Sequence, residues 1–309
     1  MATANTVRSQ KTLAHALLLA TALVWGATFT VVKSALVHIS PLLFNLLRMT
    51  LATLALAAIN HRALRGITRK QLAGGAMTGV FLGVGYQFQT LGLLTSTPTK
   101  AAFITGMLVV FVPVFLLVPA FRPAGAVRPG MAAACGAALA FAGLMLITTP
   151  AGTTLRGVFG SLSAGDLLCL GGAIAFAAHL LALARFSKGM SAGVLATLQV
   201  GFGAITMLLT LPLERPHVLF APSVLLALGI CALLGTVAAF TIQSFAQQIL
   251  PPTHTVLILA LEPVFAWLTS LLFLGEVLEG RAIVGAALIL VGILAVELFP
   301  SSNISEIPA

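Results

Sequence analysis

Long uncharged runs, separated by short breaks, constrain this chain more than any other feature of its sequence. Residues 216–261 hold 46 positions without Asp, Glu, Lys or Arg. A helix needs about 20 mostly apolar residues to cross a bilayer, so this run predicts two helices with a turn at Pro251-Pro252. The uncharged run at residues 12–32 is longer than a usual signal-peptide core, and we interpret it as the first membrane helix.

The same criterion, applied along the whole chain, predicts an all-α polytopic membrane protein. The breaks between the apolar runs carry Pro, Gly or charged residues, and no break is long enough to form a soluble domain. We expect ten transmembrane helices, near residues 13–35, 41–60, 72–93, 99–119, 129–148, 165–184, 192–212, 222–245, 253–274 and 282–299.

Composition supports the membrane interpretation and excludes other classes. Only 7% of residues are charged and 59% are hydrophobic, whereas a soluble domain has about 25% charged residues. A soluble enzyme, a disordered protein and a nucleic-acid binder are therefore excluded, despite a pI near 10.6. Cys135, Cys169 and Cys231 lie in apolar runs without metal-ligand spacing, so we expect neither a metal nor a cofactor.

The distribution of Lys and Arg predicts the orientation in the membrane. With ten spans both termini lie on one side, and that side carries ten of the basic residues against five on the other, with Arg48 inside a span. Cytoplasmic segments are enriched in Lys and Arg. We therefore expect a multi-pass protein of a bacterial-type cytoplasmic (inner) membrane, with both termini in the cytoplasm.

The two halves of the chain repeat a pattern of Pro and Gly. Pro113-Val114-Phe115 matches Pro263-Val264-Phe265, and Gly136 and Gly143 have counterparts at Gly285 and Gly292. At nearly the same offset Arg48 corresponds to Gln199, and Gly85 corresponds to Gly235. Five helices per half make the second half enter from the opposite side. We expect two inverted five-helix repeats, at residues 13–149 and 163–299, as in many secondary transporters.

Several motifs also resemble a known family. Trp25-Gly26-Ala27-Thr28-Phe29 is similar to the first helix of EamA domains. Residues 261–266 (LEPVFA), followed by Leu274-Gly275-Glu276, are similar to the end of a second EamA domain, as is Pro251-Pro252-Thr253-His254. In the first half, Ala120-Phe121-Arg122 replaces the Gly-Glu that often closes the fourth helix. The resemblance covers residues 13–299 and implies a ten-helix transporter of the drug/metabolite transporter superfamily.

Charged residues stranded at span depth are the first site candidates, because an unpaired charge in the bilayer is costly. Glu262 lies about nine residues into the ninth predicted span and could hold a cation, a proton or an amine. Arg48 lies near the middle of the second span and could bind a substrate carboxylate. The alternative for both is structural. Glu262 would pair with another helix and hold the halves together, and Arg48 would form an ion pair, with Glu262 as one possible partner, or clamp backbone carbonyl groups.

Uncharged polar and aromatic residues at similar depth complete the predicted substrate site. Lipid offers them no hydrogen-bond partner, so they face either a cavity or a neighbouring helix. Pro113 and Pro263 are the predicted hinges, because proline kinks a helix interior. The predicted substrate-binding residues are Trp25, Phe29, Asn45, Arg48, Tyr86, Gln89, His179, Gln243 and Glu262.

These features together predict a secondary active transporter. One acid, one Arg and aromatic groups suit a zwitterion, so we expect export of amino acids or similar small metabolites by alternating access. A drug or toxic-compound exporter of the same fold is the main alternative, and a lipid-translocating protein a weaker one. The expected partners are a small-molecule substrate, membrane lipid and, as one of two energy sources, protons, in a monomer or homodimer. No enzyme motif and no nucleic acid partner is expected.

Overall fold

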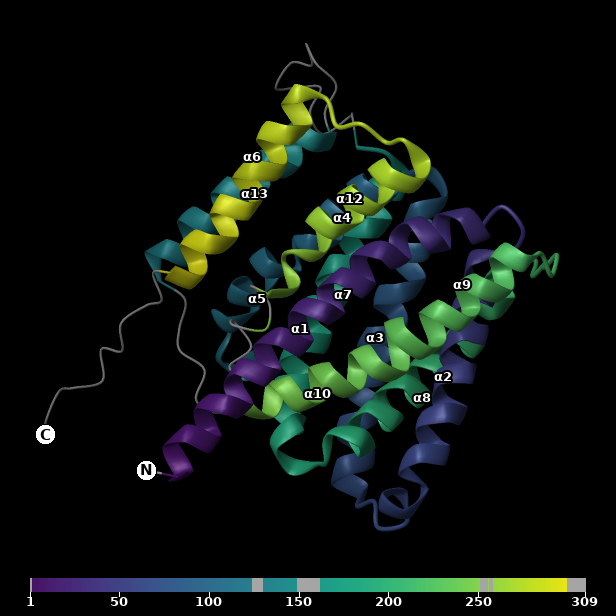
Figure 1. The fold of residues 1–309 in the computed structure, drawn as a ribbon, viewed down its shortest axis with the longest axis vertical. Coiled ribbons are helices and arrows are strands. Elements are labelled where there is room, and N and C mark those ends of the chain that lie inside the picture. Colours follow the sequence, from purple (N-terminus) through teal and green to yellow (C-terminus); the bar gives the residue numbers. More distant parts are fainter. Residues whose placement is uncertain (1, 124–129, 149–161, 251–254, 256–257, 299–309) are drawn as a thin grey trace, which may run out of the picture.

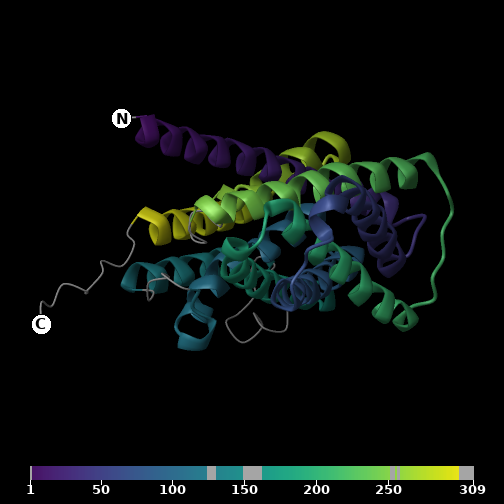
Figure 2. The ribbon, with the colours of Figure 1, turned by 90° about the horizontal axis from the view of Figure 1, so that it is seen from below.

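The computed structural model describes residues 2–123, 130–148, 162–250, 255 and 258–298, and every regular element in these residues is a helix apart from one bridge between Ile39 and Val218. Figures 1 and 2 show the helices gathered into one elongated bundle. The first half holds α1 (Ala2–Ala35), α2 (Pro41–Leu64), α3 (Arg69–Thr95), α4 (Pro98–Gly106), α5 (Leu108–Leu116) and α6 (Met131–Thr148).

The second half begins with α7 (Ala164–Phe186) and the short helix η3 (Ser187–Gly189). It continues with α8 (Ala192–Thr210), α9 (Pro222–Ala232), the π-helix η5 (Leu233–Ala238), α10 (Ala239–Ile249), α12 (Glu262–Leu274) and α13 (Gly280–Leu298). The motif at residues 251–254 lies outside the described residues, as does the start of the ninth predicted span.

Local sequence explains where the helices begin. Thr68 and Ser163 each form a capping box with the residue three positions later, Gln71 and Asp166. Such boxes satisfy backbone N–H groups that have no partner within the helix. Helices α2, α4 and α9 instead carry proline in the first turn, where its missing N–H costs nothing.

Six helical segments of the described chain are long and apolar enough to cross a membrane: 9–35, 41–64, 98–116, 164–189, 192–213 and 222–249. Shorter apolar helices occupy 134–147, 262–274 and 280–292. Helix α3 occupies the third predicted range but falls outside these six. Six spans are therefore clear, and the count of ten remains a prediction.

The two predicted proline hinges lie in different settings. Pro113 lies inside α5, as a kinking residue would. Pro263 instead lies in the first turn of α12, directly after a turn at residues 260–261. Proline is favoured at that position, so Pro263 starts a helix rather than kinking a continuous one. The ninth segment is consequently interrupted immediately before Glu262.

Corresponding helices of the two halves make corresponding contacts. Helix α6 packs along α13 at one edge of the bundle (Figure 1), α2 packs on α8, and α4 packs on α12. In the repeat, α1 corresponds to α7, α3 to α10, and α4 with α5 to α12. The first half's α3 packs on α7, and its counterpart α10 packs on α1. Likewise α12 packs on α1, and its counterparts α4 and α5 pack on α7. Corresponding elements of the two halves therefore occupy corresponding positions.

Glycines set the closest of these contacts. A Cβ atom added at Gly143 would meet the carbonyl oxygen of Gly285, and one added at Gly292 would meet that of Gly136. The four repeat-related glycines thus pair across α6 and α13. On α3, the face of Gly75, Gly79 and Gly83 lies directly against α8, as its spacing predicts.

Polar contacts tie the helices together at the end of the bundle where α1 joins α2, called here the α1–α2 end. Lys33 Nζ donates to the carbonyl oxygens of Leu93, Leu94 and Ser96 at distances of 2.7, 3.0 and 3.0 Å. Lys100 and Asp166 form a salt bridge of 2.7 Å.

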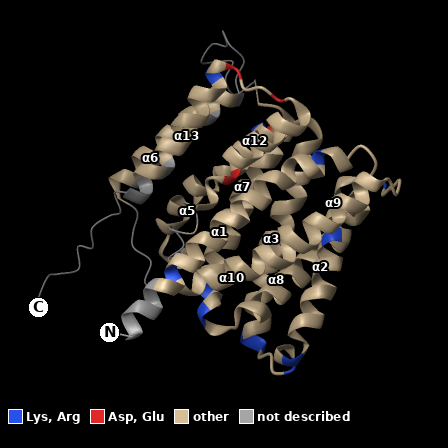
Figure 3. Ribbon diagram, in the orientation of Figure 1, with Lys and Arg blue, Asp and Glu red and all other residues tan. Residues whose placement is uncertain are grey.

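The opposite end of the bundle, where α2 joins α3, is called here the α2–α3 end. Basic residues gather there (Figure 3).

Candidate functional site

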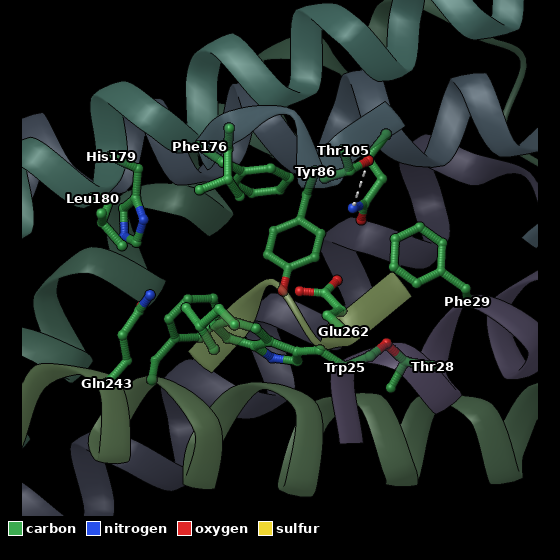
Figure 4. A pocket seen from close by; sticks show the side chains of 14 residues that line it. Trp25, Thr28, Phe29, Tyr86, Thr105, Phe176, His179, Leu180, Gln243 and Glu262 are labelled. Carbon is green, nitrogen blue, oxygen red and sulfur yellow. Dashed lines mark hydrogen bonds between the residues drawn. The ribbon is translucent and has the colours of Figure 1, made fainter. Parts of the chain in front are cut away.

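A cavity lies in the middle of the bundle, between helices of both halves. Its empty volume is about 550 Å³, a figure that counts the space between its lining atoms together with the open solvent at its mouth. Figure 4 shows its lining side chains converging from several helices. The lining residues are Trp25, Thr28, Phe29, Tyr86, Gln89, Thr105, Leu108, Phe176, His179, Leu180, Phe240, Gln243, Leu259 and Glu262.

The structure brings together seven of the nine residues predicted to bind substrate. Trp25 and Phe29 come from α1, and Tyr86 and Gln89 come from α3. The second half contributes the remaining three, His179, Gln243 and Glu262, from α7, α10 and α12. Asn45 and Arg48 are absent from the lining.

Among the lining residues that the structure describes, Glu262 is the only carboxylate and none is Lys or Arg. It occupies the first position of α12, where the positive end of the helix dipole favours a negative charge. Within the described residues its carboxylate has neither a hydrogen bond nor an ion pair. Figure 4 shows the carboxylate and the Tyr86 hydroxyl directed toward one another. The cavity therefore presents an acidic group that is free to receive a donor.

Aromatic rings form the walls around this carboxylate. Phe240 lies 5.3 Å from Trp25 and 6.2 Å from Tyr86, measured between ring centroids. Phe176 meets Tyr86 edge to face at 5.2 Å. The Trp25 indole Nε1 donates to the Gly235 carbonyl oxygen at 2.8 Å, so its orientation is fixed. Such a wall suits an apolar or cationic body, because ring faces attract cations.

His179 supplies a polar group at the opposite part of the cavity from Phe29 (Figure 4). Its Nε2 lies 2.7 Å from Gln199 Oε1, while Gln199 Nε2 donates to Ser244 Oγ at 3.0 Å. With the amide oriented in this way, Nε2 of His179 carries the proton and Nδ1 remains an acceptor. Gln243 adds an unpartnered buried oxygen, Oε1.

Arg48 lies behind the cavity wall rather than in it. Its side chain is 2% exposed and its guanidinium lies 4.3 Å from the centre of the Tyr86 ring. It donates to Thr236 Oγ1 at 3.1 Å and to the Tyr86 hydroxyl at 3.3 Å. The ion pair with Glu262, one of the structural alternatives for Arg48, is not found among the described residues, where the salt bridge is that of Lys100 with Asp166. The other alternative, a contact with a backbone carbonyl oxygen, is present at Gly235.

Two of the three hydrogen-bond partners of Arg48, Gly235 and Thr236, come from the π-helix η5. The Gly235 carbonyl oxygen accepts from both Trp25 and Arg48, and Thr236 Oγ1 also donates to the Cys231 carbonyl oxygen at 2.7 Å. A π-helix disturbs the regular i to i−4 ladder and often lies at a functional site. Here it provides the acceptors that hold Arg48 and Trp25 in place.

Asn45 joins α2 to α3 away from the cavity. Its Nδ2 donates to the Tyr86 carbonyl oxygen at 3.1 Å and to Gln87 Oε1 at 2.9 Å, and its Oδ1 accepts from Thr90 at 3.2 Å. Asn45 is fully buried. All of its side-chain hydrogen bonds join α2 to α3. Asn45 therefore positions Tyr86 and does not line the cavity.

Sequence reasoning missed several lining residues. Phe176 and Phe240 belong to a set of 19 phenylalanines, and nothing in the sequence separates a cavity wall from lipid-facing rings. Thr105 accepts from Gln89 Nε2 at 3.4 Å, a contact between helices that no spacing reveals. Thr28 lies within the Trp25–Phe29 motif, so its position there was the one available signal.

A helical bundle with a central cavity lined by both halves is an arrangement typical of membrane transporters. The sequence profile of the EamA-like transporter family matches residues 12–149 and 163–298. The chain belongs to this family.

Two further comparisons agree with this assignment. An uncharacterized transporter of Archaeoglobus fulgidus is 31% identical over 284 residues, which cover 90% of this chain and 83% of that protein. A solved crystal structure superposes with a TM-score of 0.67 at 20% identity, covering 93% of this chain and 97% of the other. At that identity the structural likeness concerns the fold alone.

Proposed function

We propose that this protein is a secondary transporter that exports small amine-bearing metabolites, amino acids among them, by alternating access across a cytoplasmic membrane. The observation that carries the proposal is the Glu262 carboxylate, which has no hydrogen bond or ion pair within the described residues and lies in a cavity whose described lining includes no Lys or Arg. An ammonium group would supply the missing partner. Gln89 and Gln243 offer amide groups for the rest of the substrate.

The position of Arg48 changes the expected recognition of a zwitterion. Because Arg48 lies behind Tyr86, a substrate carboxylate has no Lys or Arg partner among the described lining residues. The amine is therefore the group that the site recognises, and the carboxylate of an amino acid contributes less to the binding affinity. Organic cations with an aromatic or apolar body are the second candidate, because the rings of Trp25, Tyr86 and Phe240 surround the acid.

The proposal includes an arrangement in the membrane. Ten helices form two inverted repeats, at residues 13–149 and 163–299, with both termini in the cytoplasm and the α2–α3 end facing it. The basic residues at the α2–α3 end support this orientation, and the matched helix contacts of the two halves support the repeat. Protons or the substrate gradient supply the energy, and the protein works as a monomer or homodimer.

A thermal-shift panel on the purified protein tests the proposal, because a ligand that binds the folded state raises its melting temperature. The panel contains amino acids, their amides, their N-acetyl derivatives and aromatic organic cations. We expect free amines to bind, amides to bind at least as well as the acids, and N-acetyl derivatives to be silent. Binding of the N-acetyl compounds at the same strength would refute the role of the amine.

Two variants assign the binding to the cavity. Glu262→Gln keeps the size of the side chain and removes its charge, so it should abolish the shift and transport of the same compounds into proteoliposomes. Glu279→Gln is the matched control, since Glu279 is exposed and outside the cavity. Equal binding by both variants would show that Glu262 does not hold the amine.

A further inference from the structure

Helix α10 carries a stripe of buried polar residues that continues from the cavity toward the α2–α3 end. Gln243 and Gln247 are four residues apart, so they lie on one face of the helix. They are 2% and 3% exposed, and Ser244 beside them is fully buried. We call Gln243, Ser244 and Gln247 the α10 stripe.

Three of the four amide heteroatoms of Gln243 and Gln247 lack hydrogen-bond partners. Gln243 Oε1, Gln247 Oε1 and Gln247 Nε2 have no hydrogen bond in the described structure. Buried amides are normally satisfied by protein or by water, and in a membrane bundle an unsatisfied polar group is especially costly. A dry helix contact would be better served by Leu at position 247. The stripe therefore indicates a place that polar molecules occupy in some state of the protein.

The neighbours of the stripe connect it to both ends. At the cavity it meets His179, through Gln199 and Ser244, and Gln243 itself lines the cavity. At the far end Ser187 Oγ donates to the Gln247 carbonyl oxygen at 3.3 Å. Gln248 Nε2 donates to the carbonyl oxygens of Ser187 and Met190, at 3.3 and 2.9 Å. These bonds hold the end of α10 to η3, the short helix that follows α7, and to Met190 after it.

We propose that the α10 stripe is the inner half of the translocation pathway: a passage that fills with water and admits polar substrate between the cavity and the α2–α3 end. Opening requires the bonds of Gln248 to η3 to break, after which water reaches Gln247 and then Gln243. The proposal rests on the proposed transport function and adds a second polar site, at Gln247, to the cavity. Water and substrate amines or carboxylates are the ligands that a side-chain amide can serve.

Cysteine labelling tests whether water reaches the stripe. Gln247→Cys is exposed to an anionic, membrane-impermeant methanethiosulfonate reagent in sealed proteoliposomes. Ala246→Cys is the matched control, because Ala246 is the neighbouring buried residue and packs in an apolar cluster. Gly66→Cys, at the open turn between α2 and α3, reports which face of the membrane the reagent reaches. The parent chain, with buried Cys169 and Cys231 and exposed Cys135, gives the background.

We expect Gln247→Cys to react at least about tenfold faster than Ala246→Cys, and only from the face that labels Gly66→Cys, because thiol reactivity requires access to the reagent. Equal rates at positions 246 and 247, in protein that transports, would overturn the passage. Labelling of Gln247→Cys from the opposite face would overturn it as well.

A second variant separates the passage from a structural role. Gln247→Leu removes both unpartnered atoms and should raise the melting temperature while it lowers transport at least about tenfold, because polar molecules lose their contact there. Unchanged transport by Gln247→Leu would overturn the proposal. If no compound of the panel binds or moves while Gln247→Cys is labelled, the proposed substrate class fails and the passage stands.

Discussion

The approach of α1 to α12 at Gly26 allows a sharp test of how the cavity is built. A Cβ atom at position 26 would lie 2.6 Å from the Glu262 carbonyl oxygen, 2.7 Å from Phe265 Cβ and 2.8 Å from the Ala266 backbone nitrogen. Two of these atoms belong to the backbone and cannot rotate away. Relief therefore requires α12 to move by about 0.8 Å before the contact becomes ordinary.

This displacement sets the expected size of the effect. Overpacking of a well-filled contact costs about 1–3 kcal/mol, so Gly26→Ala should lower the free energy of unfolding by that amount. Gly229→Ala is the matched control, because Gly229 lies in α9 with no atom within 4 Å of an added Cβ. Alanine stabilises a helix by about 0.5–1 kcal/mol relative to glycine. The same substitution should thus have opposite signs at the two positions.

The assay is unfolding in mixed micelles, followed by circular dichroism, with ligand binding as a second readout. Because Glu262 begins α12, the shift of that helix also moves the carboxylate, and Gly26→Ala should weaken binding of the amine ligand. Gly229→Ala should leave binding unchanged. Equal stability of the two variants would refute the close contact, and loss of stability without loss of binding would refute its link to the cavity.

Two further substitutions test the polar contacts behind the cavity and at the α1–α2 end. Arg48→Met should lower the free energy of unfolding by about 1.5–3 kcal/mol, since hydrogen bonds to a charged group are lost. It should change amine affinity much less than Glu262→Gln does; an equal loss in both variants would place Arg48 in the binding site. Lys33→Met removes three bonds to carbonyl oxygens at the end of α3 and should cost about 1–3 kcal/mol in the same unfolding assay. The exposed Lys11→Met should stay within about 0.5 kcal/mol, and a similar small effect at Lys33 would mean that its bonds do not hold the helix end.

Apolar length and depth were enough to predict the six clear spans and half of the 14 described residues that line the cavity. Apolar length alone identifies a bilayer-spanning helix, because lipid permits few other backbone conformations. Depth then separates residues such as Tyr86 and Gln243, which must find partners inside the bundle. That reasoning needs no knowledge of which helices are in contact. For this reason the sequence alone predicted seven of the residues that line the cavity, out of the nine proposed.

The remainder depends on contacts that a sequence does not encode locally. Arg48 and Glu262 both lie deep in their predicted spans and have opposite charges, which suggested an ion pair. In the structure Arg48 instead donates to neutral acceptors of the π-helix, Thr236 Oγ1 and the Gly235 carbonyl oxygen. A π-helix depends on one additional residue in a turn, and the apolar sequence at residues 233–238 gives no sign of it. The start of α12 at Glu262 is likewise set by a turn whose position Pro263 alone does not determine.

The two halves match in their helices but differ in the residues that face the centre. Arg48 reaches across to η5, whereas its repeat counterpart Gln199 reaches His179 and Ser244 within the second half. If alternating access exchanges the conformations of the two repeats, the inward-open and outward-open states contain different hydrogen bonds and a different setting for the single cavity acid. They then differ in free energy, and the empty protein has a preferred resting side. Two halves with matching helices but different side-chain hydrogen bonds can thereby favour substrate binding from one side of the membrane before any gradient is applied.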